Sequence, residues 1–372
     1  MKKVVVILSA LTLLVSCTAE PRDWMAHRGV HLGYTAAGEN SLEAVDLAAR
    51  AGFVYIETDC RWTSDSVMVI IHDAALNRTF NYADGTPLGK EKVNVADVTF
   101  EELRRDFRLK ASSPERRSVI PTLEEYLLRC KEQGFRKVLI EPKLKDSTGV
   151  FYRQIIDIAD KAIGRDNYLV VSNNYANGVI RNTLGIKDVE LMGLLYQTSW
   201  DEMDALGGTV FALSSTKFSP EEFKAYYERA KADGKTIESA SGLRSQESQV
   251  NFETYNMLKG YGRGIDMIAT DLHTPDYKGQ GKTVCKFRTS KVEEIGSRLS
   301  KLEKAELYGI YLEMEYDGIA AVKVGPDAFL LPGGKELEAS YSRTIYDSKP
   351  SVEIIPGEGF KLRNCKIRII GL

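Results

Sequence analysis

PTLEEYLLRCKEQG, at residues 121–134, and KVLIEPKL, at residues 137–144, form the clearest structural unit in this chain of 372 residues. The first stretch begins with a Pro-Thr cap, repeats apolar residues at helical spacing and ends on glycine, which predicts an amphipathic helix. The second is a short apolar run, which predicts a buried strand. Helices that alternate with such strands are typical of a parallel sheet covered by helices.

The same alternation extends from residue 24 to residue 272, with further helices predicted at residues 41–52 and 219–234. The other predicted strands are WMAHRG (24–29), FVYIETD (53–59), VMVIIHD (67–73), YLVVSN (168–173), ELMGLLY (190–196), TVFALSS (209–215), KTIESAS (235–241) and DMIATDL (266–272). This many units favour a closed TIM-type (β/α)8 barrel over an open sheet. VMVIIHD follows FVYIETD after only seven residues. Because that turn is too short for a helical crossover, one of these two runs is predicted to be irregular or antiparallel.

The pattern changes after Pro275, where alternating and β-branched runs are separated by turn signals such as YDG, LPGG and PGEG. This pattern predicts a small β-sandwich-like accessory domain, with one helix near residues 291–304 packed against it. We therefore predict four parts: a signal peptide at 1–16, a lipidated linker at 17–23, the barrel at 24–277 and the accessory domain at 278–372. A packing role is favoured for the accessory domain over binding of glycans or lipid head groups.

The first residues have the pattern of an export signal. Two lysines precede an apolar run at residues 4–15, which is too short to span a membrane comfortably. Ser16 and Cys17 resemble the lipobox of bacterial lipoproteins, which predicts an exported lipoprotein anchored to a membrane through lipidated Cys17, in the periplasm or at the cell surface. An ordinary cleaved signal with an incidental Cys17 is the alternative. The remaining cysteines are widely spaced and are interpreted as isolated core residues rather than disulfides.

The composition is that of an ordinary globular protein. Lys and Arg number 50 against 52 Asp and Glu, so the formal net charge is only −2. Nothing in this balance, and no low-complexity tract, indicates a nucleic-acid partner.

Polar residues gather where the predicted strands end. In a barrel of this kind the carboxyl ends of the strands surround one mouth, and the residues placed there are His27, Arg28, Glu57, Asp59, His72, Glu141 and Lys143. Glu57 and Asp59 are two residues apart, so both side chains point to the same side of their strand. Carboxylates from two strands form an oxygen-rich site that suits Ca²⁺ or Mg²⁺ rather than Zn²⁺.

The basic residues and histidines beside this cation site indicate which reaction it could catalyse. A divalent cation flanked by Arg28 and Lys143 would attract an anion, and phosphate is the natural candidate. His27 and His72 could then take a proton from the attacking hydroxyl and give one to the leaving alkoxide, which is what cleavage of a phosphoester requires.

The ordered motifs HRG, ENSLEA, ETD, TSDSVMVIIHD, LNRT, ADVTFEEL, IPTLEE, IEPK and ATD are similar to those of the glycerophosphodiester phosphodiesterase family. The resemblance covers roughly residues 24–277. It implies a TIM-type barrel that hydrolyses glycerophosphodiesters, with one divalent cation, to an alcohol and sn-glycerol 3-phosphate. The roles it implies are metal ligands at Glu57, Asp59 and Glu141, an acid–base pair at His27 and His72, and phosphate contacts at Arg28 and Lys143.

The sequence departs from the family at three places. Ser66 stands where the family usually has glycine, and Pro142 where isoleucine or valine is commoner. KTIESAS has no aromatic residue. The family often has a tryptophan at this strand, where it forms part of the wall of the substrate site. This departure therefore bears on which alcohol the enzyme releases. Two alternative functions stay open: a phospholipase D-like or cyclising phosphodiesterase on the same barrel, and a surface lipoprotein that binds glycans or lipids.

Four further polar residues lie near the predicted site. His31 is interpreted as a solvated loop residue, and His273 equally as a loop residue or a substrate contact. Asp73 is expected to orient His72 or to cap the following turn, and Asn40 to support the site or to cap a helix.

Overall fold

The computed structural model describes residues 23–214, 216–240, 242–245, 247–260, 267–275 and 280–372. The predicted signal peptide, Cys17 and the predicted boundary between residues 277 and 278 lie outside these residues. Within them, no helix is both long enough and apolar enough to cross a membrane.

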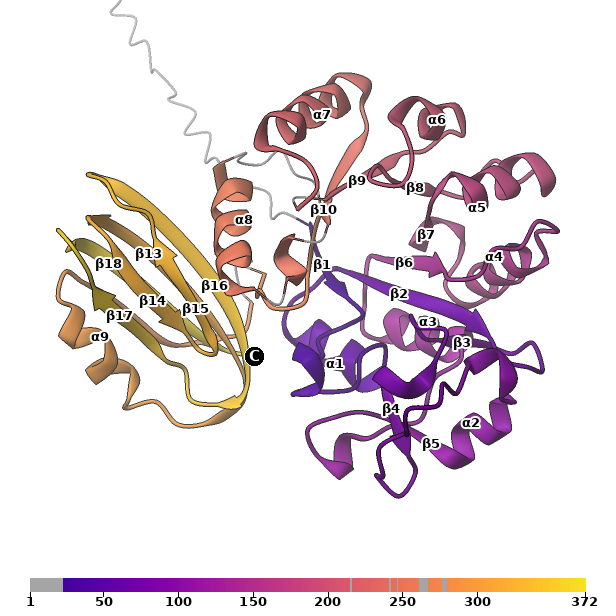
Figure 1. Cartoon of the computed structure of the whole chain (residues 1–372), viewed down its shortest axis with the longest axis horizontal. Coiled ribbons are helices and arrows are strands. Elements are labelled where there is room, and N and C mark those ends of the chain that lie inside the picture. The colour runs from indigo at the N-terminus through magenta and orange to yellow at the C-terminus, as the bar shows by residue number, and fades with distance from the viewer. Residues whose placement is uncertain (1–22, 215, 241, 246, 261–266, 276–279) are drawn as a thin grey trace, which may run out of the picture.

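Eight parallel strands form a closed barrel, which confirms the predicted (β/α)8 fold (Figure 1). They are β1 (Asp23–His27), β2 (Tyr55–Trp62), β6 (Lys137–Pro142), β7 (Tyr168–Ser172), β8 (Leu191–Leu194), β9 (Val210–Ser214), β10 (Thr236–Ala240) and β11 (Met267–Thr270). Because β1 pairs with both β2 and β11, the cylinder has no open edge between its first and last strands. Apolar side chains such as Met25, Leu139 and Met192 form one cluster in the barrel interior.

Helices cover the outside of the barrel: α1 (Leu42–Arg50), α3 (Leu123–Glu132), α4 (Val150–Ala162), α5 (Asn174–Gly178), α6 (Trp200–Ala205), α7 (Pro220–Asp233) and α8 (Ser248–Gly260). The expected cap of α3 is present as a capping box, in which Thr122 accepts from the amide of Glu125 and Glu125 accepts from the amide of Thr122. The apolar face of each helix packs on the outward side chains of the strands, and this second layer is the largest core of the molecule.

The ninth predicted strand, β3 (Met68–Ile70), pairs antiparallel with β2, as the short turn indicated. β2 continues past the barrel rim to Trp62, and β3 returns along this extension towards the mouth. His72 follows the end of β3, as expected, and because this hairpin strand runs back along β2, His72 returns to the level of Asp59 at the mouth. An insertion after it holds β4 (Phe80–Tyr82), α2 (Phe100–Asp106) and β5 (Phe107–Leu109), which pack around a small core of their own.

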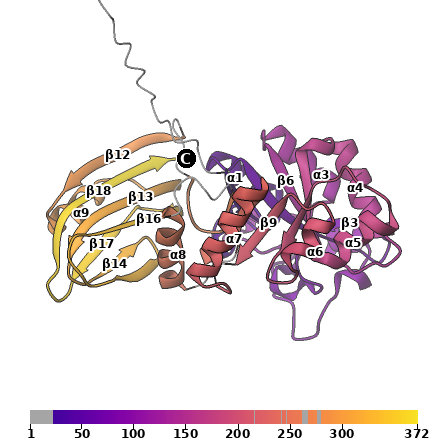
Figure 2. The ribbon, with the colours of Figure 1, turned by 90° about the horizontal axis from the view of Figure 1, so that it is seen from above.

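The C-terminal residues form two antiparallel sheets. One contains β12 (Lys282–Thr289), β18 (Lys361–Gly371), β13 (Ala305–Asp317) and β16 (Leu337–Ser348), and the other contains β15 (Asp327–Leu331), β14 (Ala320–Val324) and β17 (Val352–Pro356). The sheets share one hydrophobic core with α9 (Val292–Leu299), the helix predicted in this region. Figure 2 shows this C-terminal module beside the barrel, with α8 between them.

The module packs on the barrel through α8 and the segment after β11. The Phe252 and Phe329 rings stack with centroids 4.3 Å apart. The side-chain amide of Asn256 donates to the Ser340 carbonyl at 2.9 Å and accepts from the Ser340 amide at 2.8 Å. These hydrogen bonds fix the position of the module on α8, so the module is not merely attached by a flexible linker.

His273 belongs to this interface. It is fully buried, its Nδ1 donates to the Ser342 carbonyl at 2.7 Å, and its ring stacks on that of Tyr255. The expected loop position is confirmed, since His273 lies in the irregular segment after β11, whereas its burial in this interface argues against the alternative of a substrate contact. Burial, with the nearby charge of Arg343, lowers the pKa of His273 to about 3. The four described cysteines are all free; Cys60, Cys130 and Cys365 are buried as expected, whereas Cys285 is only half-buried.

Candidate active site

The register of the parallel strands brings the predicted site residues together. His27 of β1 lies opposite Glu57 of β2, and Asp59 of β2 lies opposite Glu141 of β6. His27 and Glu141 are near the carboxyl ends of β1 and β6, and Glu57 and Asp59 lie at the same levels within β2, which continues to Trp62. Because the residues pair strand by strand, the polar groups form one continuous wall along one side of the mouth.

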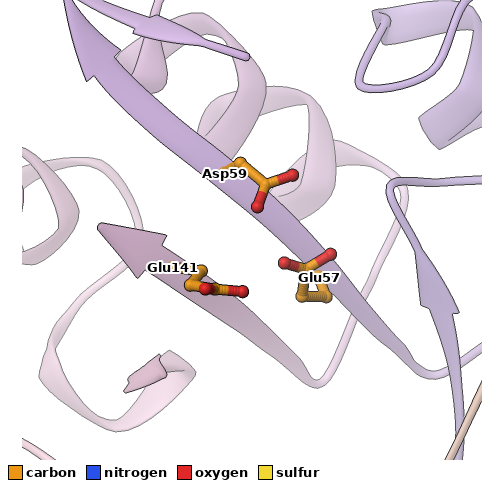
Figure 3. Close-up of side chains that lie close together, drawn as sticks. All are labelled: Glu57, Asp59 and Glu141. Carbon is orange, nitrogen blue, oxygen red and sulfur yellow. The ribbon is translucent and has the colours of Figure 1, made fainter. Parts of the chain in front are cut away.

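The three acids form the candidate metal site. One carboxylate oxygen from each of Glu57, Asp59 and Glu141 lies within 4.8 Å of the others, and Figure 3 shows the side chains extending from β2 and β6 towards one another. Both oxygens of Glu57 are buried without a hydrogen-bond partner among the described residues, and Asp59 Oδ1 is buried with only an ion pair to Lys143. Buried carboxylate oxygens at this separation need a cation or a proton to be stable. The donor set therefore fits one hard divalent cation, Ca²⁺ or Mg²⁺.

The electrostatics of these acids differ from one residue to the next. Burial and the adjacent charge of Asp59 raise the pKa of Glu57 well above its ordinary value. Although burial works in the opposite direction, Arg28 and Lys143 hold the pKa of Asp59 below its ordinary value. In the absence of a cation, Glu57 is thus the acid that most readily takes a proton.

Arg28 and Lys143, the predicted phosphate contacts, are both paired with these acids. Arg28 Nε is 3.0 Å from Asp59 Oδ2, and Lys143 Nζ is 3.2 Å from Asp59 Oδ1 and 2.5 Å from Glu141 Oε1. Asn40 also donates to Asp59 at 3.1 Å, so it supports the site, while the helix cap is Ser41. Both basic side chains lie where they could also reach a bound anion, and their contact with phosphate stays a prediction.

His27 is held by an aspartate that sequence reasoning did not single out. Its Nδ1 is 2.8 Å from Asp271 Oδ1, and its Nε2 is 3.8 Å from Glu57 Oε2. Asp271 ends the ATD motif after β11, so its position at a strand end was the signal that could have identified it. Burial, together with the positive charges of Arg244 and Arg28, lowers the pKa of His27 well below its ordinary value.

His72, the second site histidine, is held by an aspartate in the same way. Its Nδ1 is 2.7 Å from Asp73 Oδ1, which confirms the orienting role expected of Asp73. Arg78 donates to both oxygens of Asp73, at 2.6 Å from Nε and 3.1 Å from Nη2. Burial lowers the pKa of His72, an effect that Asp59 opposes and Arg28 reinforces.

Two further residues around the mouth, Glu39 and His31, were missed or misread. Glu39 accepts hydrogen bonds from Arg78 at 2.7 Å and from Arg28 at 3.2 Å, and so links the insertion to Arg28. His31 was expected to be solvated, but it is buried, with Nε2 3.9 Å from Asp271 Oδ1. Such pairings join residues that are far apart in the sequence, so periodicity alone could not have predicted them.

Comparisons with known proteins agree with this geometry. A sequence model of the Glycerophosphoryl diester phosphodiesterase family matches residues 27–169. The human protein Glycerophosphodiester phosphodiesterase 1 is 36% identical over 127 residues, which are 31% of this chain and 34% of that protein, so the match spans about a third of the relative. Glycerophosphodiester phosphodiesterase from Bacillus altitudinis is 28% identical over 66% of this chain and 93% of its own length.

Solved structures share the barrel. A glycerophosphodiester phosphodiesterase from Parabacteroides distasonis aligns with a TM-score of 0.51 and 21% identity, over 68% of this chain and 94% of its own. A phosphodiesterase from Oleispira antarctica, in complex with the product sn-glycerol-3-phosphate, aligns with a TM-score of 0.53 and 20% identity, over 68% of this chain and 93% of its own. At these identities the likeness establishes the fold.

Proposed function

The chain belongs to the glycerophosphodiester phosphodiesterase family, and we propose that it hydrolyses glycerophosphodiesters to an alcohol and sn-glycerol 3-phosphate. One observation carries the proposal: three clustered carboxylates lie beside two histidines, and each histidine is held by an aspartate, at one mouth of the barrel. A scaffold that only presented a binding module would not need this set of charged groups.

Glu57, Asp59 and Glu141 would hold the cation, which would neutralise phosphate oxygens and favour attack on phosphorus. Three carboxylates, the two basic side chains of Arg28 and Lys143 and a divalent cation leave one net positive charge. That charge matches the single negative charge of a phosphodiester. Arg28 and Lys143 would orient the diester by contacting its non-bridging oxygens.

His27 and His72 would carry the two proton transfers. In each ring the aspartate accepts from Nδ1–H, which leaves Nε2 as the atom that exchanges a proton with water or with the departing oxygen. Burial lowers the pKa of both histidines, which favours a neutral imidazole on the one that takes a proton from water. The other histidine must carry a proton on Nε2 before it can give one to the departing oxygen.

The test is the release of glycerol 3-phosphate from glycerophosphocholine, glycerophosphoethanolamine and glycerophosphoglycerol, with added Ca²⁺ or Mg²⁺ and with a chelator. We expect release that depends on the cation. Detection of a cyclic phosphate by ³¹P NMR would instead support the cyclising phosphodiesterase, and no turnover of any diester with either cation would contradict the enzymatic proposal.

We further propose that the protein is an exported lipoprotein, anchored in the periplasm or at the cell surface through Cys17. The support is the lipobox-like sequence around Ser16 and Cys17. Membrane fractionation of the wild type and of Cys17→Ala tests it, because only the variant should leave the membrane fraction. Equal retention of both proteins would contradict lipid anchoring at Cys17.

A further inference from the structure

Strand β10 places an acid in the barrel interior. Glu238 pairs in register with Ala212 of β9 and Met267 of β11, and both of these belong to the apolar cluster that fills the barrel. Only 1% of Glu238 is exposed, and its Oε2 is buried without a hydrogen-bond partner. Its carboxylate forms no ion pair with any described residue. The barrel interior thus contains a carboxylate oxygen that no described residue satisfies with a hydrogen bond.

Glu238 lies on the side of the mouth that also carries Arg244. The 3-10 helix Gly242–Arg244 follows β10, and its Leu243 carbonyl accepts from Thr270 Oγ1 at 3.0 Å, which holds it over the end of β11. Burial raises the pKa of Glu238 to about 7, an effect that the charge of Arg244 opposes and that of Glu141 reinforces. The Arg244 guanidinium forms no hydrogen bond or ion pair with the described residues, unlike that of Arg28.

A purely structural role does not account for Glu238. Burying a carboxyl group without a partner costs free energy, and its register neighbours Ala212 and Met267 show that an apolar side chain fits at this depth. The same strand is the one that lacks the aromatic residue expected for the substrate wall. A bound molecule that donates a hydrogen bond would satisfy the buried oxygen.

We propose that Glu238 is a specificity-determining residue whose buried oxygen accepts a hydrogen bond from a hydroxyl or primary ammonium group of the bound diester. This inference rests on the proposed function. Carboxylate oxygens accept hydrogen bonds from alcohols and primary amines. A quaternary ammonium has no proton to donate and is held best by aromatic rings. The hydroxyl or ammonium group that donates to Glu238 can belong to either half of the substrate, the glycerol or the alcohol.

The experiment compares the wild type with Glu238→Leu and Glu238→Gln at saturating cation. The substrates are glycerophosphoethanolamine, glycerophosphoglycerol, glycerophosphocholine and bis(p-nitrophenyl) phosphate, the last of which has no donor group. For Glu238→Leu we expect kcat/KM to fall by about 10- to 100-fold on substrates whose donor reaches Glu238, and by less than about threefold on bis(p-nitrophenyl) phosphate. Glu238→Gln keeps an acceptor oxygen and should fall less.

The pattern of losses identifies the source of the donor. A loss on all three glycerol-containing diesters assigns Glu238 to the glycerol half, whereas a loss that spares glycerophosphocholine assigns it to the alcohol half. Either pattern supports the inference. Equal losses on all four substrates, or unchanged ratios, would overturn it.

Glu190→Gln is the matched control, because Glu190 precedes β8 at the opposite end of the barrel and pairs with Lys137. It should leave every substrate ratio unchanged. Thermal unfolding and cation affinity of each variant show whether the barrel is intact. A wild type that hydrolyses none of the glycerophosphodiesters refutes the proposed function, whereas an active wild type with unchanged ratios in Glu238→Leu refutes this inference alone.

Discussion

At the residue scale, each site histidine is fixed by a carboxylate on its Nδ1. Asp271 holds His27 at 2.8 Å and Asp73 holds His72 at 2.7 Å. Such a bond sets both the tautomer and the ring orientation, because the ring must keep its proton on the nitrogen that faces the acid. The histidines are therefore positioned for proton transfer before a substrate binds.

Removing either imidazole should slow the chemical step. We expect His27→Ala and His72→Ala each to lower turnover by about 10²- to 10⁴-fold, the usual contribution of a general acid or base. Steady-state kinetics at saturating substrate and cation measure this, and cation affinity should stay nearly unchanged. Near-normal turnover in either variant would exclude the two-histidine mechanism.

Asp271→Asn tests the positioning of His27 without removing the ring. An amide can present its NH₂ group to Nδ1 and so favour the wrong tautomer, for which we expect turnover to fall by about 10²- to 10⁴-fold. A structural role alone would change stability but not the pH profile. The check is the pH dependence of kcat, which should differ from that of the wild type while the unfolding midpoint stays similar.

The carboxylate variants should behave differently from the histidine variants. Glu57→Ala removes a cation ligand, so excess Ca²⁺ or Mg²⁺ should partly restore turnover, and the cation should raise the unfolding temperature less than it does in the wild type. Activity titrated against cation concentration measures the first effect. If excess cation restored His72→Ala equally well, the division of roles between acids and histidines would be wrong.

At the element scale, the turn that joins β2 to β3 carries a strained residue. Ser66 has φ = 61°, and its amide donates to the Thr63 carbonyl at 3.0 Å, so the turn requires a left-handed backbone there. This explains why glycine is usual at this position in the family that the sequence resembles. The strain is local, because the Ser66 side chain is exposed.

Ser66→Gly should therefore raise the free energy of unfolding by about 0.5 to 1 kcal/mol, since glycine adopts this φ without steric cost. Chemical denaturation of the two proteins measures the difference. Ser64→Gly, in the same turn but with no positive φ, should lower stability, because there glycine only adds freedom to the unfolded chain. A destabilised Ser66→Gly would contradict the strain argument.

Local sequence patterns predicted the helices and strands well, but they predicted the contacts between residues far apart in the sequence only in part. Apolar runs and helix caps predicted the barrel strands, and the seven-residue turn predicted the antiparallel β3. The three acids gather as strand register required. The bond between His27 and Asp271 joins residues 244 positions apart. It depends on closure of the cylinder through β1 and β11, which no local pattern contains.

At the scale of the whole molecule, His273 makes the junction between barrel and module sensitive to acid. Its pKa is about 3 in the folded protein and ordinarily about 6.5 in an unfolded chain. Between these values the unfolded chain binds a proton that the folded protein does not, so stability falls as the pH drops below about 6.5.

We expect this single group to cost about 2 kcal/mol of unfolding free energy between pH 6.5 and pH 5. The measurement is the pH dependence of chemical unfolding in the wild type and in His273→Gln, which cannot take up this proton. The wild type should show the steeper loss on acidification. Parallel curves for the two proteins would show that His273 is not the group responsible.

The short segment after β11 connects the site to the C-terminal module. Asp271 faces His27, and two residues further on His273 is bonded to Ser342 of β16. The orientation of the His27 imidazole is therefore tied, through this segment, to a sheet of the C-terminal module. Because most of β16 is buried, substitutions there should lower stability and also disturb the position of Asp271. A barrel without this module would need another contact to hold Asp271 in place.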